Sequence, residues 1–197
     1  MAARDGARLA EKAFATAIAL HERTRANLGP ALVAAQAISD ALRAGQKLLV
    51  FGNGGSASDA QHMASELVGR FQRERAAMAA IALTTDSSIL TSVANDYSFK
   101  QVFARQVEAL GRAGDVAFGI STSGESPNVV AGLQAAKRQG LKTIALTGRD
   151  GGAVGRTADI HVNVPDQNTA RVQEVHRTLI HVMCELIEDV EVEGPNA

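Results

Sequence analysis

Two polar loops in this 197-residue chain have the composition of a phosphate-binding site. The first reads GNGGS at residues 52–56, directly after a short apolar run and before a helix-length segment. Glycines in such a turn let backbone N–H groups approach a ligand at a helix N-terminus, where the helix dipole favours an anion. The turn has neither the Walker spacing nor GxGxxG. A purely structural turn therefore stays open as the alternative.

The second loop reads STSGESP at residues 121–127 and follows another apolar run. It carries four hydroxyls within six residues, and Pro127 suits the first turn of a helix. Ordinary N-capping by Ser126 accounts for only one of these hydroxyls. The loop therefore predicts a neutral hydrogen-bonding site for a phosphate monoester.

Metal-binding or acid/base residues occur in two helix-length segments. His62 and Glu66 are four apart and share a helix face, as metal ligands, an acid/base pair or a simple exposed contact would. Gln173 and His181 lie about 80° apart around a helix and about 12 Å apart along it. One ion can take both only if the side chains converge at near full stretch or come from different subunits. His176, three residues from Gln173, is a further candidate for lining a ligand pocket beside these residues.

Short apolar runs alternate with helix-length segments through the middle of the chain. Because the runs are continuously apolar, we expect a parallel sheet covered on both faces. The expected strands are 47–51, 79–83, 116–120, 143–146 and 160–164, and the expected helices between them are 56–68, 88–94, 99–110 and 127–138.

Helices alone are expected at both ends of the chain. We predict one domain, with N-terminal helices over about 5–44, an α/β core over about 47–165 and a final helix over about 169–188. The terminal helices carry apolar stripes that need covering. Packing between subunits and packing on their own domain are both open.

Composition excludes several classes of protein. Twenty basic against twenty-one acidic residues, with no basic run, argue against a nucleic-acid ligand. An apolar fraction of 46% supports a large core, and an aromatic fraction of 4% disfavours an all-β fold. The single Cys184 cannot form an internal disulfide, and the N-terminus is charged where a signal peptide would be apolar. No apolar stretch reaches about 18 residues, so we expect a cytoplasmic protein with no membrane partner.

Six ordered segments resemble one family across nearly the whole chain. They are similar to the sedoheptulose-7-phosphate isomerases, or phosphoheptose isomerases, of the sugar-isomerase (SIS) fold. That resemblance implies a flavodoxin-like domain with a five-stranded parallel sheet, a homotetramer with active sites between subunits, and one Zn²⁺ per subunit. The segments are FGNGGSASDAQHMASELVGRF, ALTTDSS, ANDYSF, GISTSGESPNV, ALTGRDGG and RVQEVHRTLIH.

The resemblance also implies roles for particular residues. Glu66 would be the catalytic base and His181 its acid/base partner. Glu125 stands where a neutral residue is more usual, and its carboxylate would disfavour a phosphate unless it points away. The implied metal ligands are His62, Glu66, Gln173 and His181, and the implied substrate contacts are Asn53, Gly54, Gly55, Glu66, Asn95, Asp96, Ser121, Thr122, Ser123, Ser126 and Gln173.

The activity implied is isomerisation of sedoheptulose 7-phosphate to D-glycero-D-manno-heptose 7-phosphate through an enediol. That step stands at the entry to heptose synthesis for lipopolysaccharide or other surface polysaccharides. Two alternatives stay open: a non-enzymatic SIS-fold tetramer that binds a replication initiator protein, and an isomerase for another sugar phosphate. The acid/base set argues against a mere scaffold, whereas sugar length cannot be read from the motifs.

Overall fold

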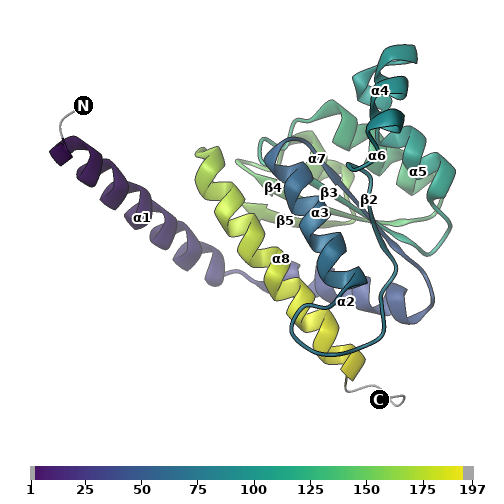
Figure 1. The fold of residues 1–197 in the computed structure, drawn as a ribbon, viewed down its shortest axis with the longest axis horizontal. Coiled ribbons are helices and arrows are strands. Elements are labelled where there is room, and N and C mark those ends of the chain that lie inside the picture. Colours follow the sequence, from purple (N-terminus) through teal and green to yellow (C-terminus); the bar gives the residue numbers. More distant parts are fainter. Residues whose placement is uncertain (1–2, 193–197) are drawn as a thin grey trace.

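A five-stranded parallel sheet organises the computed structural model, which describes residues 3–192 (Figure 1). The strand order β2-β1-β3-β4-β5 is the flavodoxin-like order, so the predicted fold class is confirmed. Each predicted strand lies within two residues of an observed one. The strands are β1 (Leu48–Gly52), β2 (Ala80–Ala82), β3 (Val116–Ser121), β4 (Lys142–Gly148) and β5 (Ile160–Val164).

Eight α-helices and one 3₁₀ helix surround the sheet within the described part of the chain. The segment expected as one helix over 99–110 is divided in two, and the six-residue α7 was not predicted. The helices are α1 (Ala3–Arg25), α2 (Gly29–Arg43), α3 (Gly55–Val68), α4 (Ser87–Asp96), η1 (Phe99–Gln101), α5 (Ala104–Leu110), α6 (Pro127–Arg138), α7 (Gly152–Thr157) and α8 (Thr169–Val192).

Both faces of the sheet are buried, which explains the continuous apolar runs. Along β1, Leu48 and Val50 face the cluster formed with α2, α3 and α8, whereas Leu49 and Phe51 face the cluster formed with α5, α6 and α7. Successive side chains of a strand point to opposite faces, so every residue of β1 needs to be apolar. In Figure 1, α2, α3 and α8 lie on one side of the sheet, and α5 and α6 lie on the other.

Two glycines let α6 lie close to the sheet. A Cβ at Gly119 of β3 would be 2.8 Å from Val129, and one at Gly132 of α6 would be 2.8 Å from the Phe51 ring. Both distances are shorter than packed side chains allow. The close approach fixes the start of α6, immediately after the serine-rich loop.

Helix α1 extends away from the rest of the chain (Figure 1). It is attached to α8 by Arg171, which donates to the Ala13 carbonyl at 2.8 Å, and by His21, which is 3.0 Å from the Thr178 hydroxyl. Phe14 and Ile18 share one face of α1 and are 74% and 58% exposed. The chain's own domain therefore leaves this apolar stripe uncovered. None of the helices described within residues 3–192 is apolar over enough turns to span a bilayer.

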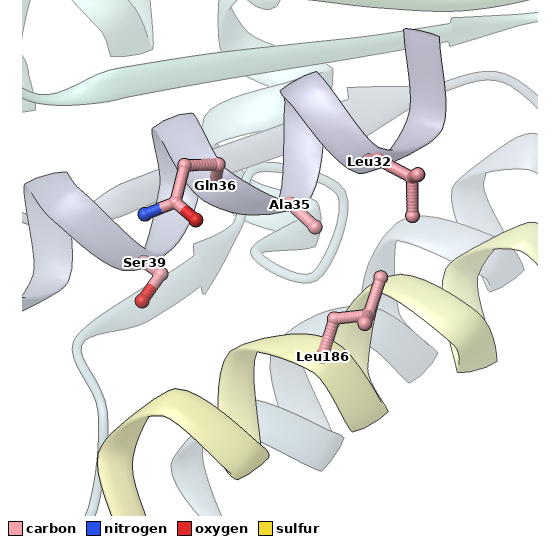
Figure 2. Close-up of a pocket in the computed structure, with 5 residues that line it drawn as sticks. All are labelled: Leu32, Ala35, Gln36, Ser39 and Leu186. Atoms are coloured by element: carbon pink, nitrogen blue, oxygen red, sulfur yellow. The ribbon is translucent and has the colours of Figure 1, made fainter. Parts of the chain in front are cut away.

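The contact between α2 and α8 leaves a small hollow of about 150 Å³. Figure 2 shows Leu32 of α2 and Leu186 of α8 pointing toward one another across it, with Ala35, Gln36 and Ser39 completing the lining. The Ser39 hydroxyl is buried and makes no hydrogen bond. These two helices are thus joined mainly by apolar contact.

His176 is on the buried face of α8 and lines no pocket in the described part of the chain, so the prediction that it lines the pocket is wrong. Its side chain is fully buried, and Nε2–H donates to the Thr147 carbonyl at 3.0 Å, while Nδ1 has no partner. Burial lowers the pKa of His176 to about 4, although the bond to Thr147 acts in the opposite direction. The imidazole is therefore neutral in the folded protein at neutral pH.

His176 should make the fold sensitive to acid. The unfolded chain, with a histidine pKa near 6.5, binds a proton below that pH and the folded chain does not until about pH 4, so stability falls as pH drops through this window. His176→Gln keeps a donor for Thr147 but cannot titrate. From pH 7 to pH 5 we expect wild type to lose about 2 kcal/mol more than His176→Gln in urea unfolding. Equal losses would contradict this account.

Candidate functional site

The two loops singled out in the sequence lie at the same edge of the sheet. β1 and β3 are neighbouring parallel strands, with Gly52 opposite Ile120, so the loops that follow them emerge side by side. Gly54 adopts a positive φ of 56°, a backbone conformation that favours glycine. α3 and α6 begin directly after these loops. The predicted anion-binding positions therefore lie together beyond the carboxyl ends of the strands, where open α/β sheets bind their ligands.

A reciprocal amide pair joins the two loops. Asn53 Nδ2 donates to Asn128 Oδ1 and Asn128 Nδ2 donates to Asn53 Oδ1, both at 2.8 Å. Asn128 is buried, and its oxygen also accepts the N–H of Val129. Sequence reasoning singled out Asn53 but missed Asn128. The signal available was its position in the segment GISTSGESPNV, one residue inside α6.

Three hydroxyls of the second loop converge. Ser121 Oγ is 2.8 Å from Ser126 Oγ and 3.4 Å from Ser123 Oγ, and Ser123 Oγ accepts the N–H of Glu125. Thr122 lies between them, half-buried. Hydroxyls and backbone N–H groups of this kind could hold a phosphate without a cation, because they can donate to its oxygens.

Glu125 points away from the hydroxyls, toward α7. Its carboxylate accepts the N–H of Ala153 at 3.1 Å and lies 3.9 Å from Arg156. A Cβ at Gly152 would collide with the same carboxylate. The carboxylate thus caps the first turn of α7 and leaves the serine-rich loop neutral.

Helices α3 and α8 run side by side so that successive turns of one meet successive turns of the other. Arg177 donates to Asp59 at 2.7 Å, and the next contact along is between His62 and His181, whose Nε2 atoms are 2.7 Å apart. The Glu66 carboxylate is 3.3 Å from His62 Nε2. The structure thus brings together His62, Glu66 and His181, which are named here the acid–base trio.

Gln173 lies at the other end of this contact. Its amide packs on Gly55, where a Cβ would collide with Nε2. Gly55 is two turns, or about 10 Å, before His62 along α3. A hollow of about 710 Å³ lies beside it and includes Asp59 and Arg177 in its lining. Within this chain Gln173 is therefore placed to contact a ligand at the glycine turn, and it does not reach the acid–base trio.

Burial and the positive charge of Arg177 shift the pKa values of Asp59 and His62, which lie between the glycine turn and the end of α3. Burial raises the pKa of Asp59, against the opposing effect of Arg177, and its Oδ2 has no hydrogen-bond partner. Burial lowers the pKa of His62, and the positive charge of Arg177 acts in the same direction. These effects favour the neutral form of His62, which is the form that binds a metal or accepts a proton.

The donor atoms of the acid–base trio suit zinc, but its two histidine nitrogens lie closer together than two zinc ligands do. Two imidazole nitrogens and a carboxylate are common zinc ligands, with Zn–N distances of about 2.0–2.1 Å. Tetrahedral geometry then places two such nitrogens about 3.3 Å apart, against the 2.7 Å between His62 and His181. Among residues 3–192, no three His, Cys, Asp or Glu side chains form a ready-made metal site. An ion would need to open the histidine pair by about 0.6 Å.

Asn95 and Asp96 stand apart from these groups. They end α4, a helix with no buried residue that extends beyond the edge of the sheet (Figure 1). Asn95 Nδ2 donates to Asp96 Oδ1 at 2.8 Å, and both side chains are exposed. Among the described residues, neither side chain hydrogen-bonds to the two loops or to the acid–base trio. Their role as substrate contacts stays a prediction.

Comparison with known proteins identifies close relatives over most of the chain. Residues 12–148 match the family model described as SIS domain. The chain is 55% identical over 162 residues to a phosphoheptose isomerase of Geobacter sp. (strain M21), covering 82% of this chain and 84% of that one.

Two solved structures share the whole fold. Phosphoheptose isomerase GmhA from Neisseria gonorrhoeae has a TM-score of 0.88 and 46% identity, covering 94% of this chain and 99% of its own. A phosphoheptose isomerase from Francisella tularensis has a TM-score of 0.87 and 38% identity, with coverages of 96% and 100%.

Proposed function

This chain belongs to the SIS-domain family and, within it, to the phosphoheptose isomerases, and from this premise we propose that it interconverts sedoheptulose 7-phosphate and D-glycero-D-manno-heptose 7-phosphate. The observation that carries the proposal is the contact between α3 and α8. At one end of this contact is the glycine turn, a loop of the kind that binds phosphate, and two turns away along α3 is the acid–base trio. The reaction would supply heptose for surface polysaccharides, in the cytoplasm.

The two loops would hold the phosphate end of the sugar. Ser121, Ser123 and Ser126 present hydroxyls to one point, with Thr122 beside them, and the glycine turn adds the N–H groups of Gly54 and Gly55. Gln173 lies next to Gly55 and would contact the same end of the substrate. Anchoring a remote group lets its binding energy position the reacting carbons.

The acid–base trio would move the protons. Glu66 takes a proton from C1 of the ketose, and the electron pair of that C–H bond forms the enediol while the C2 oxygen gains a proton. Glu66 then returns its proton to C2, and the O1 hydroxyl loses its proton as the C1 carbonyl forms. His181 exchanges protons with the C1 and C2 oxygens, and His62 is in contact with both Glu66 and His181.

We assign one Zn²⁺ per subunit to this site, with His62, Glu66 and His181 as ligands in a single chain. When bound, zinc would supply a positive charge that polarises the substrate oxygens and holds these side chains. Gln173 was expected to be the fourth ligand. Because its amide packs on Gly55, it would have to swing toward the histidines or come from another subunit.

An assay on sugar phosphates of five, six and seven carbons, with metal content measured in parallel, tests the proposal. The expected result is fastest turnover with sedoheptulose 7-phosphate, an aldose product, and zinc retained with the protein. Turnover only with a shorter substrate such as arabinose 5-phosphate would reassign the sugar. No turnover by zinc-loaded protein on any of them would overturn the proposal and favour a binding role.

Replacing Glu66 separates catalysis from binding. Glu66→Gln keeps an oxygen near His62 but cannot accept a proton from carbon, so turnover should fall by about 10²–10⁴-fold while sugar-phosphate binding persists. Rates and metal content are measured together. Glu185→Gln, at an exposed carboxylate of α8, is the control and should stay within a few-fold of wild type. Near wild-type turnover in metal-replete Glu66→Gln would transfer the base role to His181.

We also assign a homotetramer with active sites between subunits. The support is the apolar stripe on α1, where Phe14 and Ile18 are largely exposed. Phe14→Asp places a charge on this stripe and should shift the sedimentation profile toward smaller species at micromolar concentration. Ala19→Asp adds the same charge at an exposed position about 140° around α1 from Phe14 and should leave the profile unchanged. Equal profiles for the two variants would contradict the assignment.

A further inference from the structure

We propose that Glu188 and Arg75 form a buried clasp that positions the acid–base trio, a role that rests on the proposed isomerase function. Neither residue faces the substrate loops. The clasp lies where the end of α3 and the loop over residues 69–76 meet the last turns of α8. It is therefore placed to hold both helices that carry the trio.

The Glu188 carboxylate is the centre of the clasp. Only 2% of the residue is exposed. One oxygen accepts the N–H of Phe71 at 3.1 Å, and the other accepts those of Gln72 and Arg73 at 2.8 and 2.9 Å. Burial opposes ionisation, yet these donors and Arg75 hold the pKa of Glu188 below its usual range. One carboxylate thus fixes three consecutive residues of the loop.

Arg75 closes the end of α3. Its Nη2 donates to the carbonyl of Glu66 at 2.7 Å, and its Nη1 donates to the carbonyl of Leu67 at 2.9 Å and lies 3.3 Å from that of Gly69. The last carbonyls of a helix have no donors within the helix. Arg75 Nε is 3.4 Å from the Glu188 carboxylate, a buried ion pair in which Nε makes no hydrogen bond. The backbone of the proposed base is therefore tied to Glu188 through a single side chain.

Phe71 connects the clasp to His181. Its backbone N–H is held by Glu188, and its ring lies against the His181 ring with centroids 5.5 Å apart and planes at 37°. His181 in turn meets His62, and His62 meets Glu66. The contacts make a closed circuit from Glu188 through Phe71 and the trio to the Glu66 carbonyl and back through Arg75. Both ends of the trio are held by one buried pair.

Burying an ion pair is a costly way to stabilise a loop. Well-packed apolar residues of similar volume are often as stabilising or more so. An apolar contact, however, does not orient a backbone, whereas three N–H bonds to one carboxylate define where the Phe71 ring lies. Glu188 and Arg75 are accordingly positioning residues, acting through Phe71 and the end of α3.

The test compares variants of the full-length, metal-loaded enzyme. Glu188→Gln turns an amide toward three N–H donors, so kcat should fall at least tenfold with KM within about threefold, because small misplacements of reacting groups cost about 10²-fold. Arg75→Lys keeps the ion pair but loses the two guanidinium nitrogens that donate to the α3 carbonyls. It should therefore also lower kcat with little change in KM. Asp189→Asn breaks the exposed pair with Arg73 on the same loop, at 2.8 Å, and should leave kcat unchanged.

Two further readouts separate positioning from folding and from the function itself. The His181 ring signals in NMR of ¹³C-histidine-labelled protein should move in Glu188→Gln and not in Asp189→Asn, whether or not the protein is an isomerase. Phe71→Leu combined with Glu188→Gln should lower kcat no further than the more damaging single variant, within about twofold.

Three outcomes would overturn the clasp: wild-type kcat in both Glu188→Gln and Arg75→Lys, unmoved His181 signals in folded Glu188→Gln, or kcat losses that multiply in the double variant. If Glu188→Gln does not fold, the kcat and KM of Arg75→Lys decide. Moved His181 signals in a chain without isomerase activity would leave the clasp standing and reject the proposed function.

Discussion

The packing of α8 against α3 is the constraint on which the rest of the site depends. Both helices cover the same face of the sheet, and both contribute buried apolar residues to one core cluster, such as Met63 and Leu67 of α3 and Ile180 and Cys184 of α8. Because the helices run side by side in register, each turn of one meets a turn of the other. The polar pairs at the edge of this contact follow from the apolar seam beneath them. A change in that seam would move the glycine-turn end and the acid–base trio together.

The sheet supplies the second half of the geometry. β1 and β3 are neighbours, so the glycine turn and the serine-rich loop emerge together, and the Asn53–Asn128 pair joins them. Neutral donors dominate this end, since Glu125 is turned onto α7. The titratable groups are gathered two turns along α3. Separating a neutral anchoring end from a titratable reacting end suits a substrate whose charge lies far from its reacting carbons.

Buried polar groups in this chain divide into two kinds. His176 is neutral, bonds one carbonyl and serves the core, so its effect is on stability. Asp59–Arg177 and Glu188–Arg75 are ionic, and both stand where α3 meets α8. Buried charges need several well-placed partners to be tolerated. A third buried carboxylate, Asp115, pairs with Lys47 at the amino ends of β1 and β3, so the seam between α3 and α8 holds two of these three pairs.

Local pattern in the sequence was enough for the strands and most helices, because short apolar runs buried on both faces alternate with helical spacing. It also indicated both loops, whose glycines and hydroxyls are contiguous, and the His62–Glu66 pair, which one helix face determines. α7 escaped detection because it is short and glycine-containing, and Glu125 from a distant loop caps it. Tertiary structure alone decided that His181 meets His62 while Gln173 meets Gly55, and it alone brought Asn128 to Asn53 and Glu188 to Phe71. The physical reason is that spacing along one helix follows from its pitch, whereas the register between two elements more than seventy residues apart is set only when their apolar faces pack.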